Sequence, residues 1–138
     1  MEQTKDPMAG VKTTDFVVLL RISTNKTGGS ESNGISAQRR DINLFLQRQE
    51  RPRVVKEFVE VESGASEHRP VLEEALDLCR KTHSILLVQK VCRLSRDVES
   101  LARIVKDKLV DIKVACLPNA DNFQIHLYGI LAAQERQF

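Results

Sequence analysis

The sequence contains no tryptophan, and its aromatic residues are five phenylalanines and one tyrosine in a chain of 138 residues. No apolar run comes near the roughly 18 residues that a membrane-spanning helix needs, which excludes a membrane partner of that kind. The first residues carry no apolar core of the signal-peptide type. We therefore expect a polar, flexible lead over residues 1–15, followed by one domain over residues 16–138.

Cysteine and histidine are also sparse, and neither is spaced as a metal-binding motif requires. The cysteines are Cys79, Cys92 and Cys116. An odd number without a CxxC pair argues against a disulfide framework or a zinc site and favours a reducing, intracellular setting. The three histidines lie far apart, without HExxH or HxxxH spacing. The sequence thus predicts no metal and no other cofactor.

The signatures of nucleotide-binding loops and of the common serine nucleophile are missing. The glycine-containing stretch "TGGSESNG" has neither the ending of a phosphate-binding P-loop nor the GxGxxG pattern, and GxSxG does not occur. The net charge of +2 does not by itself demand a nucleic-acid partner. Any chemistry must come from residues that the fold brings together.

What the sequence does contain is an alternation of short apolar runs and helical spacings. Strands are expected over residues 16–22, 54–61, 84–90 and 112–117, and helices over 35–50, from 70 onward, over 97–109, and from 122 to the C-terminus. Ser36 is the expected N-cap of the first helix. Strands that alternate with helices predict an α/β domain with a mainly parallel sheet flanked by helices.

The helical spacings also predict which side of each helix is buried. For the helix from residue 70 the buried set is Leu72, Ala75, Leu76 and Cys79. For the helix over 97–109 it is Val98, Leu101, Ala102, Val105 and Leu109. For the last helix it is Phe123, Leu127, Ile130 and Leu131.

In a parallel sheet, ligands bind at the carboxyl ends of the strands. That rim is predicted to carry Arg21 and Ser23, then residues 60–63, Arg69 and residues 90–96. Arg21 and Ser23 are two apart and so lie on one side of their strand. The alternative for Arg21 is a plain structural pair with a nearby glutamate.

Arg93 and Arg96 are spaced by three, so both can point to one side of a turn near a helix start. Arginine forks and a helix N-terminus both suit a phosphate, although two solvated surface arginines are the alternative. Without a histidine partner, Ser23 can act as a nucleophile only if arginines assist it. Crowded guanidiniums stabilise the charge that develops when a phosphodiester is attacked.

Five motifs in this order resemble the catalytic domain of the serine recombinases, the resolvase/invertase family. They are "LLRIST", "SAQRRDI", "FVEVESGAS" followed by "RP", "KVCRLSRD" and "ILAAQER". The resemblance covers the chain from about residue 16 to its end and implies a resolvase-like fold. The residues that match family positions are Arg21, Ser23, Gln38, Glu60, Ser63, Arg69, Lys90, Cys92, Arg93, Arg96, Glu135 and Arg136.

The resemblance implies a mechanism and partners. Ser23 would attack a DNA phosphodiester to give a 5′-phosphoserine link, while Arg21, Arg69, Arg93 and Arg96 clamp the phosphate. Gln38, Glu60, Ser63, Lys90, Cys92, Glu135 and Arg136 would support the site. The resemblance further implies a DNA substrate, a homodimer and a tetramer in the full-length protein, and no small-molecule cofactor. It also implies a cytoplasmic protein of a prokaryotic mobile element, with this chain ending early in a long dimerisation helix.

The chain departs from the family pattern at three positions. Leu19 replaces a common tyrosine, Glu60 replaces a common aspartate, and Cys92 stands where the family motif has aspartate. These departures leave open an impaired homologue that acts as a DNA-bound regulator or transposon accessory protein. An alternative of another class is a flavodoxin-like or receiver-like module for a small phosphorylated ligand.

Overall fold

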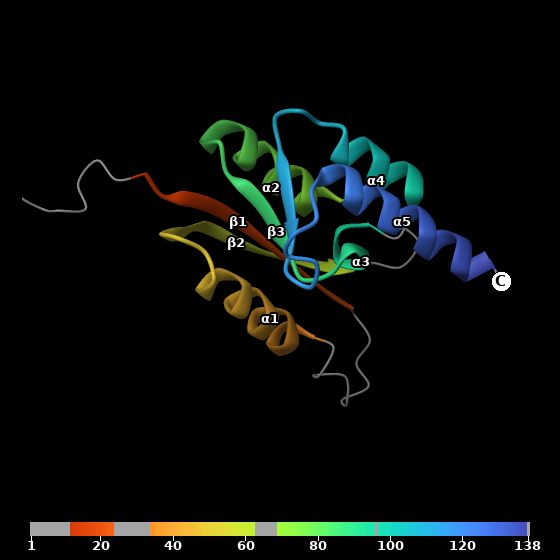
Figure 1. Cartoon of the computed structure of the whole chain (residues 1–138), viewed down its shortest axis with the longest axis horizontal. Helices are drawn as coiled ribbons and strands as arrows, with labels where there is room; N and C mark the ends of the chain where they lie inside the picture. The colour runs from red at the N-terminus through yellow and green to blue at the C-terminus, as the bar shows by residue number, and fades with distance from the viewer. Residues whose placement is uncertain (1–11, 24–33, 63–68, 96, 138) are drawn as a thin grey trace, which may run out of the picture.

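The computed structural model describes residues 12–23, 34–62, 69–95 and 97–137 (Figure 1). Its elements, in chain order, are β1 (Thr14–Ser23), α1 (Ile35–Gln47), β2 (Pro52–Glu62), α2 (Pro70–Thr82), β3 (Ile85–Val88), α3 (Val91–Leu94), α4 (Val98–Val105), β4 (Asp111–Val114) and α5 (Asn122–Gln137). The predicted α/β class is confirmed.

The four strands form one parallel sheet in the order β2-β1-β3-β4. Strand β1 lies inside the sheet, and residues 16–20 of it are all buried. A strand covered on both faces needs apolar residues at successive positions, not alternating ones, which explains the run "FVVLL". The pairing of β1 with β2 extends to Ser23, whereas its pairing with β3 stops at Val18.

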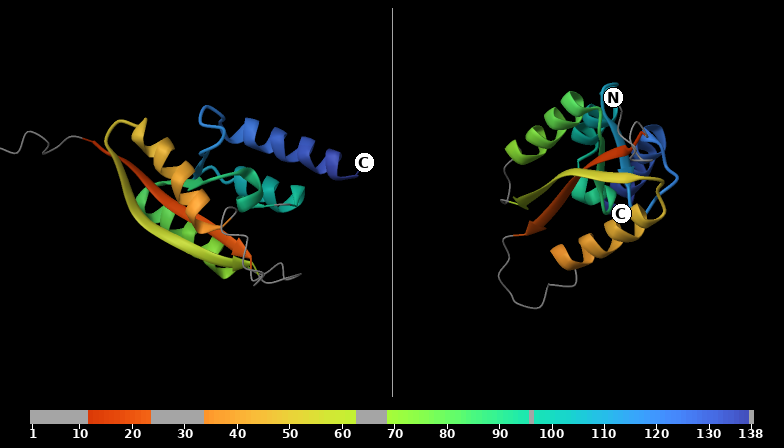
Figure 2. Two further views of the ribbon diagram at one scale, coloured as in Figure 1. Left: turned by 90° about the horizontal axis from the view of Figure 1, so that it is seen from below. Right: turned by 90° about the vertical axis from the view of Figure 1, so that its left-hand side faces the viewer.

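Helices cover both faces of the sheet (Figures 1 and 2). Helix α1 lies on one face, where the ring of its Phe45 meets Phe16 of β1 edge-on, with centroids 5.8 Å apart. Helices α2, α4 and α5 lie on the other face. None of the helices in the described ranges has the length and apolar composition to cross a bilayer.

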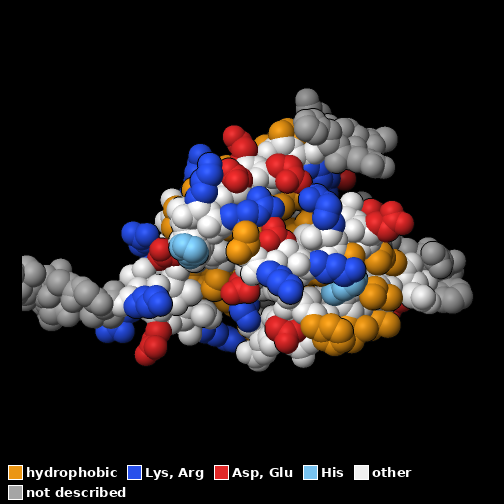
Figure 3. Space-filling model, turned by 90° about the horizontal axis from the view of Figure 1, so that it is seen from above, with side chains coloured by type: hydrophobic (Ala, Val, Ile, Leu, Met, Phe, Trp, Pro, Cys, Tyr) orange, Lys and Arg blue, Asp and Glu red, His pale blue; other side chains and the backbone are white. Residues whose placement is uncertain are grey.

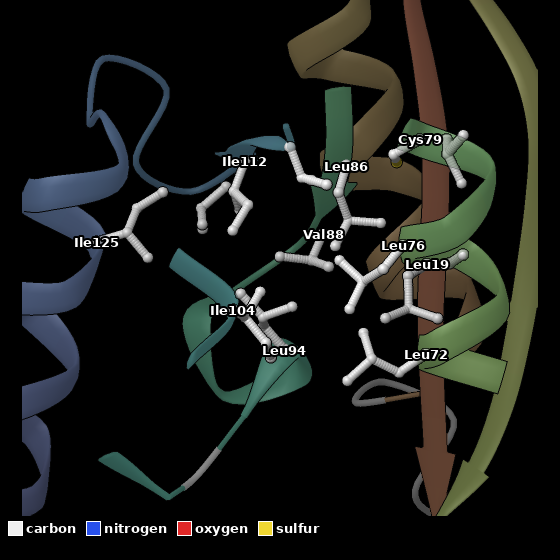
Figure 4. Packing of buried hydrophobic residues seen from close by; sticks show 14 of the residues in the cluster. Leu19, Leu72, Leu76, Cys79, Leu86, Val88, Leu94, Ile104, Ile112 and Ile125 are labelled. Atoms are coloured by element: carbon white, nitrogen blue, oxygen red, sulfur yellow. The ribbon is translucent and has the colours of Figure 1, made fainter. Parts of the chain in front are cut away.

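The larger core lies between the sheet and α2, α4 and α5 (Figure 4). Leu19, Leu86 and Ile112 of three strands face Leu76 of α2 and Ile125 of α5 across it, and each is at most 1% exposed. The predicted buried side of α2 is confirmed, because all four of its residues are at most 2% exposed. Burial raises the pKa of the Cys79 thiol in this set to about 12.

Several predicted boundaries were wrong. Helix α1 begins at Ile35 with Gly34 at its N-cap, so Ser36 lies within the first turn and is not the cap. Strand β3 ends at Val88, because the chain turns at residues 89–90 into α3, a short helix that the apolar pattern did not indicate. Strand β4 ends at Val114 for a similar reason, since residues 115 and 116 enter a turn.

Helix α4 is shorter than predicted. It is capped by Asp97, whose carboxylate accepts a hydrogen bond from the Ser100 amide at 3.1 Å, and hydrogen bonds from Ser100 lower the pKa of that carboxyl. The helix ends at Val105, so Leu109 lies beyond it and is 71% exposed. Ile104, which the predicted set omitted, is buried instead.

Helix α5 faces the core with the opposite side from the one predicted. Its buried residues are Ile125 and Gly129. The predicted set of Phe123, Leu127, Ile130 and Leu131 is 37–73% exposed. Hydrophobic side chains accordingly gather on the surface over α5 (Figure 3). The helix carries two apolar sides, and periodicity alone identifies the larger one without showing which side the core contacts.

Gly129 sets how closely α5 approaches α4. A methyl group at this position would lie 2.1 Å from the Cδ2 atom of the buried Leu101. We predict that Gly129→Ala lowers the free energy of unfolding by about 1–3 kcal/mol, the usual cost of overpacking, despite the better helix propensity of alanine. Chemical denaturation measures the change. In a Leu101→Ala background the same substitution should be neutral or stabilising, and an equal loss in both backgrounds would refute the steric explanation.

Candidate functional site

The candidate site lies where β1 and β2 end side by side. Arg21 is opposite Glu60 and Ser23 is opposite Glu62 in the parallel register. Ser23 is exposed and is the last residue of β1. The prediction that Arg21, Ser23 and Glu60 share one rim of the sheet agrees with this register.

Glu60 is a buried carboxylate, only 5% exposed. Its Oε1 atom is 3.4 Å from Nε of Arg21, and it accepts hydrogen bonds from Nε and Nη2 of Arg69. The second oxygen, Oε2, accepts from Nε of Arg69 at 3.0 Å. The sequence alternative, in which Arg21 pairs with a nearby glutamate, is therefore confirmed, and the pair holds Arg21 at the rim.

Arg69 links this pair to α3. Its Nη1 atom donates a hydrogen bond to the carbonyl of Leu94, and Nη2 donates to the carbonyl of Arg93 at 3.4 Å. These carbonyls belong to the end of a helix, where backbone acceptors lack intrahelical partners. The guanidinium of Arg69 therefore fixes α3 against β2.

Arg93 completes the connection back to β1. Its Nη1 atom donates to the carbonyl of Arg21 at 3.3 Å. Two of the predicted arginines, Arg21 and Arg69, thus meet at Glu60, and Arg93 joins them through the Arg21 carbonyl, although the three come from β1, the start of α2 and α3. Their three positive charges outnumber the carboxylates of Glu60 and Glu62 at the end of β2.

Gln38 of α1 holds the backbone of Arg21. Its Oε1 accepts from the Arg21 amide at 3.0 Å, and its Nε2 donates to the Arg21 carbonyl at 2.9 Å. Strand β3 has already stopped pairing with β1 at Val18, so this stretch of β1 lacks a strand neighbour on that side. The fully buried amide of Gln38 takes the place of a strand and satisfies both backbone groups.

The other predicted site residues are not joined to this cluster. Within the described ranges, no side-chain hydrogen bond or ion pair links Lys90, Cys92 or Glu135 to it, and all three are exposed. Ser63 and Arg96 lie outside the described residues, as does the side chain of Arg136. Their roles stay predictions. The described part of the chain contains no group of acidic, histidine or cysteine residues arranged for a metal ion.

A hydrogen-bonded pair at the end of β3, with one buried partner, was not predicted from the sequence. Gln89, 4% exposed at the end of β3, donates to the Asp41 carboxylate of α1 at 2.7 Å. This hydrogen bond is the main cause that lowers the pKa of Asp41. The sequence contains one indication of this contact, which is the amide side chain of Gln89 directly after the apolar run "SILLV". A polar side chain that is buried at the end of a strand needs a hydrogen-bond partner inside the protein. The pair fixes the turn that leads into α3.

We predict that Glu60→Gln lowers the free energy of unfolding by about 3–5 kcal/mol, because it leaves two largely buried guanidiniums without their carboxylate. The matched control is Glu57→Gln on the same strand, whose exposed pair with Arg39 contributes at most about 1 kcal/mol. Chemical denaturation of both variants tests this. Similar losses for the two would contradict a special role for the buried carboxylate.

Comparison with known proteins agrees with the predicted family and with the α/β fold. A family model described as "Resolvase, N terminal domain" matches residues 16–138. No curated protein sequence matches the chain.

Solved structures with the same fold include the N-terminal catalytic domain of TP901-1 integrase (19% identity, TM-score 0.61, 91% of this chain and 95% of that one). A resolvase family site-specific recombinase from Streptococcus pneumoniae is 21% identical, with a TM-score of 0.63 over 91% of this chain and 89% of that one. The C-terminal catalytic domain of ISC1926 TnpA, an IS607-like serine recombinase, is 18% identical, with a TM-score of 0.57 over 85% and 77% of the two chains.

Proposed function

The chain belongs to the resolvase family of serine recombinases, and from that premise we propose that it is a catalytic domain that cuts and rejoins DNA through Ser23. The observation that carries the proposal is the arrangement at the end of β1. Arg21 and Arg69 share the buried carboxylate of Glu60 there, and Arg93 donates to the carbonyl of Arg21, which precedes the exposed Ser23 by two residues. Such a cluster favours an anionic target. The match of the resolvase family model to residues 16–138 argues against the flavodoxin-like alternative.

In the proposed reaction, the Oγ atom of Ser23 forms a bond to the phosphorus of a DNA phosphodiester. The bond from phosphorus to the 3′ oxygen breaks, which leaves a 5′-phosphoserine and a 3′-hydroxyl. Ser23 loses one proton and the leaving oxygen gains one, so the step balances. The guanidiniums stabilise the negative charge that develops on the phosphoryl oxygens. Attack by a 3′-hydroxyl on the phosphoserine reverses the step, so religation needs no ATP.

The contacts of the three arginines support a preorganised clamp. Gln38 fixes the backbone of Arg21, and Glu60 orients the side chains of Arg21 and Arg69. Groups held before substrate arrives cost little reorganisation during the reaction, which is the main source of electrostatic catalysis. Arg96 and Arg136 are proposed to join the clamp, with Ser63, Lys90 and Glu135 in supporting roles.

Cys92 bears on whether this copy of the site is active. It lies on α3 where the family motif has an aspartate, and α3 contains no carboxylate of its own. Glu60 of β2 contacts Arg21 and Arg69 without any carboxylate from α3. That contact favours an active enzyme. The second candidate, an impaired homologue that acts as a DNA-bound regulator or accessory protein, is favoured by the same departure at Cys92.

We predict that Ser23→Ala abolishes covalent protein–DNA adducts, with a loss of about a thousandfold or more, because the nucleophile is removed. The full-length protein is incubated with supercoiled plasmid carrying the DNA that flanks its gene, and adducts are counted after denaturation. The matched control is Ser36→Ala, since Ser36 is exposed in the first turn of α1 and should leave adduct formation unchanged.

Adducts that persist in Ser23→Ala would refute the assignment. A wild-type protein that binds the same DNA without forming any adduct would instead favour the regulator. In that case Cys92→Asp, which restores the residue of the family motif, should produce adducts if the departure at this position is the cause.

We further propose that the exposed apolar side of α5 is where two copies of this chain meet. Leu127, Tyr128 and Leu131 are 46–54% exposed on one helix. Burying such side chains against a partner stabilises association by roughly 25 cal/mol for each Å² removed from water. The implied dimer of the full-length protein fits this surface.

The double substitution Leu127→Lys with Leu131→Lys should abolish concentration-dependent dimerisation in sedimentation experiments, because it places two charges on the contact surface. Stability should change by no more than about 0.5 kcal/mol, as for other exposed positions. The control is Leu44→Lys, which alters a residue that is 52% exposed on α1. A wild-type chain that stays monomeric at every concentration, or a dimer that survives the double substitution, would argue against this surface.

A further inference from the structure

Two exposed cysteines lie near each other beside α3. Cys92 is the second residue of that helix, and Cys116 follows β4. The backbone continues the β3–β4 pairing past Val114: the Ala115 amide donates to the Val88 carbonyl at 2.8 Å, and the Cys116 amide donates to the Gln89 carbonyl at 3.0 Å. Cys116 is thus fixed beside the residue that precedes Lys90 and the first turn of α3.

The surroundings give the two thiols different characters. The Sγ atom of Cys116 is 3.8 Å from the Asp41 carboxylate, and partial burial together with that carboxylate raises the pKa of Cys116. Cys92 follows Gln89, the backbone partner of Cys116, by three residues, so both thiols belong to the region where β3 turns into α3. Cys79 is fully buried in the core and does not belong to this pair.

We propose that Cys92 and Cys116 form an oxidant-responsive pair that closes to a disulfide when the protein meets a peroxide. The exposed Cys92 thiolate attacks a peroxide oxygen, the O–O bond breaks, and a sulfenic acid forms while the other oxygen leaves as water. The Cys116 thiolate then attacks the Cys92 sulfur and displaces the hydroxyl group as a second water. Two thiols and one hydrogen peroxide thus give one disulfide and two waters.

Closure changes the position of α3. Both cysteines are free thiols in the structure, and a disulfide requires their Cβ atoms to approach to about 3.5–4.5 Å. Because β3 and β4 are held by their ladder, the four-residue α3 is the element that moves.

Such a shift would act on the phosphate clamp. Arg93 follows Cys92 directly, its guanidinium donates to the Arg21 carbonyl, and its own carbonyl accepts from Arg69. Tethering Cys92 therefore pulls on the contacts that join Arg93 to Arg21 and Arg69. The effect on catalysis rests on the proposed function, whereas the disulfide itself does not.

The first experiment detects the disulfide directly. The protein is treated with hydrogen peroxide under native conditions, and tryptic fragments are analysed by mass spectrometry without reduction. A fragment that joins Cys92 to Cys116 within one chain is expected, with Cys79 still a thiol. Cys116→Ser should show no such link. Oxidation of Cys92 to a sulfinic acid without a link, or links only between separate chains, would overturn the proposal.

The second experiment measures the effect of the disulfide on adduct formation by the full-length protein. Peroxide should lower adduct formation by up to about a hundredfold, the loss expected when a catalytic group is misplaced by ~1 Å, and dithiothreitol should restore it. Cys116→Ser should keep its activity in peroxide. An intramolecular link with undiminished adducts would overturn the regulatory effect. A link in a protein that never forms adducts would overturn the proposed function and leave the disulfide standing.

Discussion

The rim of this domain depends on one buried carboxylate. Glu60 is held between the guanidiniums of Arg21 and Arg69, and Arg69 continues to the carbonyls at the end of α3. A charge in this position is tolerated only because its hydrogen bonds replace those of water. Four separate segments, β1, β2, the start of α2 and α3, are fixed relative to one another by this single group. The arginines therefore reach a shared place without any loop of special sequence.

Gln38 meets a different requirement at the same rim. Strand β3 stops pairing with β1 five residues before Ser23. The backbone amide and carbonyl of Arg21 therefore have no neighbouring strand on that side and need another partner. An amide side chain offers both an acceptor and a donor, so it can replace a strand at one residue. A carboxylate or a hydroxyl group at position 38 cannot do both with the same geometry. A glutamine at this position therefore has a structural role.

The elements that carry the site differ in how firmly they are held. The strands β1 and β2 pair over ten residues, whereas α3 is a single turn fixed by side chains. A short element held by few contacts can move at low cost. One exposed thiol, Cys92, lies on this helix, and the other, Cys116, is bound to the backbone of Gln89 just before it. This is the route by which the proposed disulfide would act on Arg93. The third cysteine is in the rigid core and has no such connection.

The family, the α/β class and the rim at the strand ends could be predicted from sequence, because runs such as "FVVLL" and motifs such as "LLRIST" are local. The partners of each charge could not be predicted. The pairing of Glu60 with Arg21 depends on strand register, and that of Arg69 with Leu94 depends on a helix that no apolar pattern indicated. The outward side of α5 was also decided only by packing, since Gly129 lets that helix approach Leu101 closely and turns the larger apolar stripe to the surface. Sequence alone thus predicted that Arg21, Glu60, Arg69 and Arg93 lie near one rim, and long-range packing decided which of them hold one another.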